Sequence, residues 1–92
     1  MVTIIVAMTF KPEFTEVAKK LAKKLKKESR KEVGCKSYKV LQDVNDINTL
    51  VFIEKFYDNE GVEFHKNTKH VIEILKAQMG PMINTKVVHF VK

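Results

Sequence analysis

Cysteine, glycine and proline are scarce in this 92-residue chain, and the scarcity excludes several classes of protein. A single cysteine cannot form an internal disulfide, which favours a reducing compartment. Three glycines cannot supply the GxGxxG fingerprint or the P-loop of nucleotide-binding proteins. No apolar run approaches the roughly 20 residues of a membrane-spanning helix. The N-terminal apolar run lacks the basic start and small-residue exit of a secretory signal, so we expect a cytoplasmic protein with no membrane partner.

The remaining composition is that of an ordinary globular protein. Apolar residues make up 45% of the chain and charged residues 30%, unlike the apolar-poor composition of disordered proteins. No linker, repeat or low-complexity tract interrupts the sequence, so residues 1–92 are expected to fold as a single domain. At this length the free energy of unfolding should lie towards the low end of the usual range, roughly 5–15 kcal/mol.

Basic residues outnumber acidic ones by 17 to 11, and nine of them lie within residues 11–31. A basic helix can follow a phosphate backbone, and a sheet with exposed aromatics can bind RNA. However, acidic residues are interleaved here, with Glu16 and Lys20 at the spacing of a surface ion pair, and the aromatics form no RNA-binding motif. We therefore interpret this segment as a solvated helix face and expect no nucleic-acid partner.

The hydrophobic pattern switches between strand and helix periods along the chain. Strands are expected at Val2–Phe10, Cys35–Gln42, Thr49–Tyr57 and Asn84–Val91. Helices are expected from Pro12 to about Glu32, stopped by Gly34, from the cap Asp58 to about Lys66, and from a cap at Asn67 or Thr68 to Gly80-Pro81. The order β-α-β-β-α-β predicts an α+β, ferredoxin-like fold, in which helices cover one face of a four-stranded antiparallel sheet.

Each long helix should present one apolar stripe to that sheet. The first stripe comprises Phe14, Val17, Ala18, Leu21, Ala22 and Leu25, and the last comprises Val71, Ile72, Leu75 and Met79. The first and third strands are apolar on both faces, whereas the helices can cover only one. A second copy, packed sheet against sheet, would bury the other face. The sequence therefore predicts a homodimer.

Glu54 is the one carboxylate inside the strongly apolar third strand, where it alternates in phase with Leu50, Phe52 and Phe56. An ionised carboxylate among such neighbours is costly unless it is paired or its pKa rises. Two interpretations stay open at this stage. Glu54 either forms a salt bridge or hydrogen bond across a dimer, or it serves as a polar anchor or proton acceptor beside an apolar cavity.

Histidines supply the other candidate chemistry. His65 and His70 can donate or accept a proton near neutral pH, or be packed in the interior as satisfied side chains. They lie about 140° apart on a continuous helix, which does not suit a metal pair, so no metal site is expected. His89 is an isolated polar residue in the last strand, and Cys35 is expected to act as a small buried hydrophobic residue.

Three short motifs carry a family resemblance. They are Glu32-Val33-Gly34-Cys35 followed by Tyr38, Glu54 followed by Phe56-Tyr57 and Asn59, and Phe64-His65 followed by Thr68 and His70. In this order and spacing they resemble the antibiotic biosynthesis monooxygenase family, over essentially the whole chain. The resemblance implies a dimeric α+β barrel, in agreement with the two-faced strands.

The resemblance also implies an activity. Well-known enzymes of that family oxidise quinols or polycyclic phenols with O₂, without flavin, haem or metal, so no cofactor is expected. A deprotonated phenol can itself reduce O₂, and the protein then needs an apolar pocket, a base and positioned donors. The implied catalytic residues are Glu54, His65 and His70. One of the two histidines would take the substrate proton, and Glu54 would orient that histidine. The implied substrate-binding residues are Tyr38, Phe52, Phe56 and Phe64.

Other members of the same family offer alternatives. Haem-degrading members carry an Asn in the first strand and a Trp where this chain has His65, so haem degradation is not expected. The isomerase that processes the phosphorylated autoinducer-2 sugar is similar over Val40–Asp43 and Phe64–His70, and needs only acid and base groups. A dimer that binds a small aromatic or sugar-phosphate ligand without turnover is the third alternative.

Overall fold

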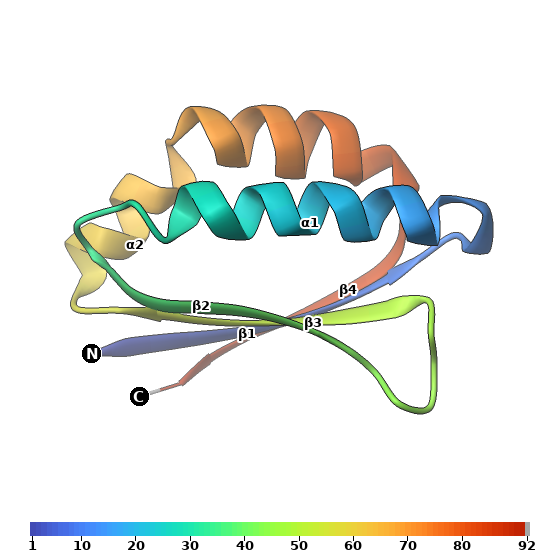
Figure 1. Cartoon of the computed structure of the whole chain (residues 1–92). Coiled ribbons are helices and arrows are strands. Elements are labelled where there is room, and N and C mark those ends of the chain that lie inside the picture. Colours follow the sequence, from blue (N-terminus) through green and yellow to red (C-terminus); the bar gives the residue numbers. More distant parts are fainter. Residues whose placement is uncertain (92) are drawn as a thin grey trace.

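The computed structural model describes residues 1–91, which form a sheet with helices on one of its faces (Figure 1). The strands are β1 (Val2–Phe10), β2 (Cys35–Gln42), β3 (Thr49–Phe56) and β4 (Ile83–Val91). The helices are η1 (Pro12–Phe14), α1 (Thr15–Ser29), α2 (Asn59–Lys66), η2 (Val71–Met79) and η3 (Gly80–Met82). The predicted ferredoxin-like β-α-β-β-α-β order is confirmed.

The sheet is fully antiparallel, with the strand order β2-β3-β1-β4. Alternate residues of the central strands point toward the helices, as a side-chain period of two requires. In β1 the inward set includes Ile4, Val6, Met8 and Phe10, all buried. The opposite set is only half-buried. The inner face of the sheet is therefore the core, and the outer face is left without a covering layer by this chain.

Helix α1 lies along the sheet with Ala18, Ala22 and Leu25 completely buried beneath it. The predicted stripe holds except at Val17, which is exposed because it lies on the edge of the helix face. The helix ends at Ser29 rather than near Glu32. No described helix combines the length and apolarity that crossing a membrane requires.

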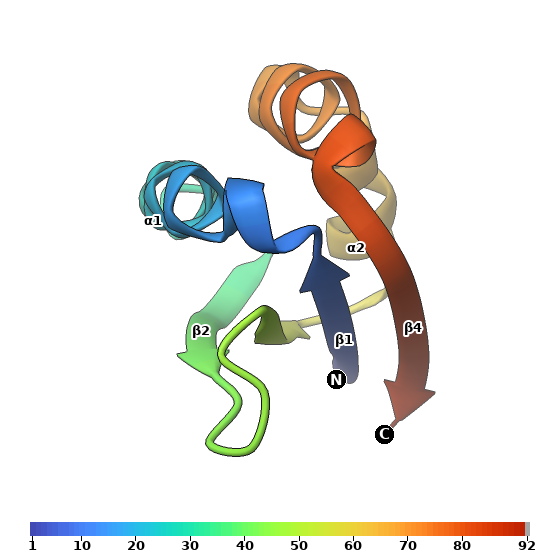
Figure 2. The ribbon, with the colours of Figure 1, turned by 90° about the vertical axis from the view of Figure 1, so that its right-hand side faces the viewer.

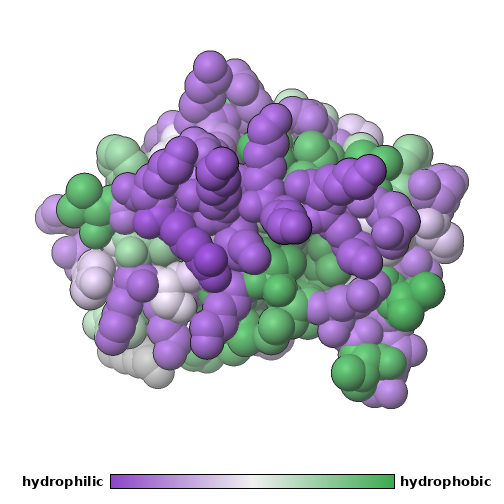
Figure 3. Space-filling model, viewed as in Figure 1, coloured by the Kyte–Doolittle hydropathy of each residue, from purple (hydrophilic) through white to green (hydrophobic). Residues whose placement is uncertain are grey.

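Hydrophilic side chains gather over α1 in the upper part of Figure 3, where this helix presents its exposed lysines to solvent. Side chains such as Lys20, Lys23, Lys24 and Lys27 are exposed. This placement agrees with the interpretation of the basic segment as the outer face of an amphipathic helix.

The second helical layer is η2, a π-helix that follows a short α-helical start at Lys69. Its buried residues are Val71, Ile74 and Met79. The prediction had placed Ile72 in the stripe instead of Ile74, but Ile72 is exposed. The error arises from the winding, because i→i+5 hydrogen bonding changes which residues share a face relative to an α-helix.

Strand β4 forms the edge beside β1 and runs beyond the shelter of the helices (Figure 2). It begins one residue earlier than predicted, at Ile83, and every residue after that one is exposed. Val88 and Phe90 pair with Val6 and Ile4 and therefore share their inward side of the sheet, yet Phe90 is 61% exposed. Apolar side chains are consequently uncovered at this edge.

Candidate functional site

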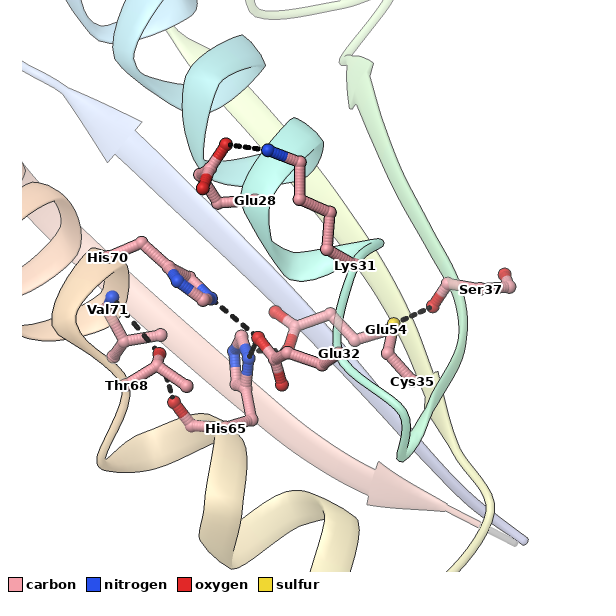
Figure 4. A network of polar contacts seen from close by, with 10 residues as sticks. All are labelled: Glu28, Lys31, Glu32, Cys35, Ser37, Glu54, His65, Thr68, His70 and Val71. Carbon is pink, nitrogen blue, oxygen red and sulfur yellow. Dashed lines mark hydrogen bonds and ion pairs between the residues drawn. The ribbon is translucent and has the colours of Figure 1, made fainter.

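Three side chains that are distant in sequence converge at one end of the helix layer (Figure 4). Glu32 Oε2 lies 2.8 Å from Nδ1 of His65 and 2.6 Å from Nε2 of His70. Glu32 and His65 are buried, and His70 is partly buried. Because a carboxylate oxygen only accepts, each imidazole nitrogen donates to it. One carboxylate oxygen thus orients two histidines.

Glu32 reaches this position because of the turn that follows α1. The helix ends at Ser29, and the backbone N–H of Glu32 donates to the Ser29 carbonyl at 3.1 Å. Two residues later Gly34 packs against Gly61 of α2, where a Cβ on Gly34 would lie 2.7 Å from the Gly61 Cα. Gly34 was predicted to stop the helix, but the helix ends before it, at Ser29, and the φ of Gly34 is not positive. Its absent side chain instead lets the turn approach α2 closely.

The two histidines meet because the helix between them is interrupted. Asp58 caps α2 by accepting from the Gly61 N–H at 2.8 Å, as predicted, and α2 ends at Lys66. Thr68 Oγ1 then donates to the His65 carbonyl at 2.7 Å and accepts from the Val71 N–H at 3.4 Å, which confirms the predicted second cap.

This interruption changes the relation between the two imidazoles. The sequence argument had set them about 140° apart on a continuous helix. That premise was wrong, because the chain changes direction at Thr68 and brings His65 and His70 to a ring separation of 6.1 Å.

Glu54 lies on the inner face of the sheet, between Tyr38 of β2 and Ile4 of β1 in the strand register. Its Oε1 is 3.5 Å from Nε2 of His65. Burial raises the pKa of Glu54 to about 7, and the nearby Glu32 carboxylate adds to that rise. This location excludes a salt bridge across the outer sheet face and places Glu54 against the second nitrogen of His65.

The predicted aromatic residues occupy two different environments. Phe56 and Tyr38 pack around His65, with ring centroids 5.0 and 5.9 Å from the imidazole, and Phe52 packs on Tyr38 at 6.3 Å. These three aromatic rings are buried and form the floor under the histidine. Phe64, in contrast, is 64% exposed and faces a pocket on the surface.

Burial also changes the pKa values of His65 and of Tyr38, which packs against it. The pKa of His65 is lowered because desolvation disfavours the imidazolium, although the Glu32 carboxylate opposes this effect. Desolvation raises the pKa of Tyr38 well above its ordinary value. Both groups are therefore held in their neutral forms near neutral pH, which favours hydrogen bonding over charge at the base of the site.

A pocket of about 750 Å³ opens beside the cluster. Its lining includes Glu32, His70 and Thr68 from the site, Val33, Gly34, Gly61 and Phe64 from the two packed segments, and the charged residues Glu28, Lys31, Asp58, Glu60 and Lys69. Volumes of roughly 300–1,000 Å³ are typical of small-molecule sites. His70 is the histidine that lines this pocket, whereas His65 lies beneath it.

Sequence reasoning quoted Glu32 in a motif without assigning it a role, and this residue is the centre of the observed cluster. Its signal was an acidic residue two positions before a glycine, at the end of a segment rich in basic residues. Two other residues lie outside the cluster. His89 is exposed on β4, and Cys35 is half-buried rather than buried, with a pKa raised to about 11 mainly by desolvation.

Comparison with known proteins agrees with this architecture. A sequence profile described as "Antibiotic biosynthesis monooxygenase" matches residues 1–77. A curated chain of Bacillus subtilis (strain 168), named "Putative monooxygenase YcnE", is 35% identical over 60 residues. That match covers 65% of this chain and 63% of YcnE, so it spans less than two thirds of that relative.

Solved structures share the whole fold. PA3566 from Pseudomonas aeruginosa is 26% identical with a TM-score of 0.91, and the match covers 98% of this chain and 90% of that one. Rv0793 from Mycobacterium tuberculosis is 21% identical with a TM-score of 0.92, covering 99% and 92%, which shows the common fold alone. With the profile matching most of its length, the chain belongs to the antibiotic biosynthesis monooxygenase family.

Proposed function

We propose that this protein is a cofactor-independent monooxygenase that uses O₂ to oxidise a quinol or polyphenol-type substrate. The observation that carries the proposal is the pair of histidines bound to the buried Glu32, with His70 lining a pocket that matches a ring compound in size. Family membership and the similarity to YcnE support the reaction class.

In this proposal His70 is the base. Glu32 accepts from Nε2–H of His70, which fixes the tautomer and leaves Nδ1 unprotonated and able to take a proton. A carboxylate behind an imidazole also stabilises the imidazolium that forms, as in other histidine bases oriented by an acid. His65 and Glu54 position this base without contacting the substrate. His65 donates to the same Glu32 oxygen, and Glu54 faces the other nitrogen of His65.

The remaining chemistry belongs to the substrate. A phenol or anthrone that loses a proton to His70 becomes electron-rich enough to pass an electron to O₂. Recombination forms a carbon–oxygen bond, and loss of water from the peroxide gives the quinone. For an anthrone the balance is one O₂ consumed and one H₂O released, with two hydrogens lost from the ring carbon.

The proposal includes a homodimer formed through the outer face of the sheet. Leu41, Val51, Ala7 and Val87 lie side by side across all four strands on that face. Leu41 and Val87 are about half exposed, at 52% and 51%. A row of apolar side chains across a whole sheet needs a cover, and a second copy offers the same row in return.

The test is oxygen uptake by protein treated with a chelator, across a panel of hydroquinones and anthrones. Catalytic uptake above the autoxidation blank is expected, and His70→Ala should lower it by about 100-fold or more, the usual contribution of a positioned base. Lys76→Ala is the control and should retain full activity, because Lys76 is exposed on η2, away from the pocket and from the outer sheet face. Uptake that is absent, or unchanged in His70→Ala, would contradict the proposal.

A second candidate is isomerisation of a phosphorylated sugar similar to the autoinducer-2 signal. Lys31 and Lys69 line the pocket and could hold a phosphate, and the paired histidines suit proton transfer. A thermal shift with sugar phosphates but not with quinones would favour this reaction, since a ligand of the folded state raises the melting temperature. A shift with either ligand and no turnover would indicate a small-ligand-binding dimer.

A further inference from the structure

The cluster of Glu32, His65 and His70 has the composition of a metal-ligand set as well as that of a proton-transfer site. Its three ligand atoms, two imidazole nitrogens and one carboxylate oxygen, all lie within 4.8 Å of one another. We propose that these residues bind a divalent transition-metal ion such as Zn²⁺, and that the ion blocks the proton transfer on which the proposed function rests. The second half of the inference depends on that function, and the first half does not.

The geometry needs only a small expansion to admit the ion. Tetrahedral zinc with bonds of about 2.0–2.1 Å holds its ligand atoms roughly 3.3 Å apart. The hydrogen bonds now hold Glu32 Oε2 at 2.8 Å from His65 Nδ1 and 2.6 Å from His70 Nε2. A metal ion would take the place of the two N–H protons, and each proton would move to the other nitrogen of its own ring, so that both histidines bind as neutral imidazoles. Thr68 separates the helical segments that carry the two histidines, so His70 can move without displacing His65.

Glu54 supplies the outer support that metal-bound histidines usually have. Such a histidine donates its second ring N–H to a carboxylate, which fixes the tautomer and directs the ligating nitrogen at the ion. Glu54 Oε1 lies 3.5 Å from Nε2 of His65, on the opposite side of the ring from Glu32. Phe56 and Tyr38 pack around the same ring and hold its plane.

A fourth coordination position is also available. Glu32 Oε1 is buried and has no hydrogen-bond partner among the described residues, an arrangement that costs free energy unless something satisfies the atom. It could ligate the ion as the second oxygen of the carboxylate or accept from a metal-bound water. The pocket beside Gly34, Phe64 and His70 gives the ion its route of entry.

The ligand types select the class of metal. Two imidazoles and one carboxylate suit Zn²⁺, Co²⁺, Ni²⁺ or Fe²⁺, whereas Mg²⁺ and Ca²⁺ prefer sites made of oxygen atoms. An ion on His70 Nε2 and Glu32 would take the carboxylate that otherwise stabilises the His70 imidazolium. The metal-loaded protein should therefore be inactive in the proposed oxidation, and a chelator should restore activity.

Isothermal titration of the metal-stripped full chain with Zn²⁺, and with Co²⁺ followed by its visible absorption, tests the binding directly. One ion per chain is expected with a dissociation constant at or below about 10 µM. His70→Ala should weaken binding by about 100-fold, and Glu54→Gln by roughly 10-fold, as for an outer-shell partner. His89→Ala, which removes an exposed histidine, should bind as the unmodified chain does.

Several outcomes overturn the inference. Affinity for Zn²⁺ that is unchanged in His70→Ala, or lost equally in His89→Ala, would mean that other surface groups bind the ion. Circular dichroism of each variant separates lost ligation from lost folding, and the partly exposed His70 is chosen because it is the ligand whose removal disturbs the core least. Metal binding without oxygen uptake in chelator would refute the proposed function and, with it, the blocking role of the ion, but not the metal site. Uptake without metal binding would refute only this inference.

Discussion

The two faces of the sheet are built from equally apolar strands but end in different states. On the inner face Ile4, Val6 and Phe52 are buried under the helices. On the outer face their immediate neighbours Ile5 and Val51 are only half-buried. Over β1 and β3 the inner face is thus covered by this chain alone, while the outer face has no covering layer from it. Alternation along a strand decides which residues belong to which face.

The two faces also differ in the charged side chains that they carry. The inner face encloses Glu54, with no lysine or arginine within salt-bridge distance among the described residues, and the outer face carries Lys39 and Lys55 at its border. A buried carboxylate with a raised pKa is costly for folding and is typical of functional sites. In the proposed function, the inner face carries the chemistry and the outer face serves association.

The largest expected effect is on the inner face, where Phe52 is completely buried. Phe52→Ala should lower the free energy of unfolding by about 3–5 kcal/mol, because a large cavity opens in the core. Val44→Ala, in an exposed loop, should change it by less than about 0.5 kcal/mol. Urea denaturation of both variants measures the contrast. Equal losses would show that the inner face is not the core.

The buried Glu54 on the inner face should make the free energy of unfolding depend on pH. Its pKa is about 7 in the folded chain against an ordinary 4.5, so between those values the folded chain keeps a proton that the unfolded chain has lost. The associated stability is present below the lower pKa and is lost as the pH rises through the higher one. Glu54→Gln stays neutral and should remove this loss, worth on the order of 3 kcal/mol above about pH 8.

Denaturation of the unmodified chain and of Glu54→Gln at about pH 5 and about pH 8 checks this expectation. The lowered pKa of His65 has the opposite sign, because it costs stability as the pH falls below the ordinary value, but His65 is present in both proteins. Parallel pH profiles for the two proteins would contradict the raised pKa of Glu54.

On the outer face, Val51→Lys should break association. Val51 lies in the apolar row between Leu41 and Ala7, so a dimer would bury two unpaired ammonium groups there. The dissociation constant should rise by about 100-fold or more while the monomer keeps its fold. Sedimentation measures both states, and Val33→Lys, at a position 95% exposed and off the sheet, is the matched control. A monomeric unmodified chain at micromolar concentration would refute the dimer itself.

The smallest effect is expected where neither face is involved. Lys31 lies 2.9 Å from Glu28 at the end of α1, and both groups are solvent-accessible. An exposed ion pair contributes little, because water and salt screen it. Lys31→Ala should leave the melting temperature unchanged within error. A clear decrease would show that this ion pair stabilises the end of α1 despite its exposure to solvent.

The sequence was sufficient for the strands and for most helix boundaries, because alternation, caps and glycines act locally. The cap at Asp58 and the second cap at Thr68 both follow from side chains that bond their own neighbours. Such signals also identified His65, His70 and Glu54 as candidates for chemistry. The winding of η2 had no such signal, since π- and α-helices use the same residues.

The assembly of the site could not be predicted in the same way. Glu32 meets His65 across 33 residues of sequence, and that contact depends on a glycine–glycine approach between two segments. Nothing in the periodicity of either segment specifies their distance. Phe64 was given the same predicted substrate-binding role as Phe52 and Phe56, yet it is exposed while they are buried. Exposure follows from packing rather than from residue type.

The interruption at Thr68 has a consequence for insertions and deletions. In an unbroken helix, removal of one residue rotates everything after it by about 100°. Here His65 is placed by α2, and His70 by the segment that begins after Thr68, so the angular phase of the two imidazoles is set at this short joint. A length change inside η2 would leave the histidine pair intact, whereas loss of Asn67 alone would swing His70 out of the site.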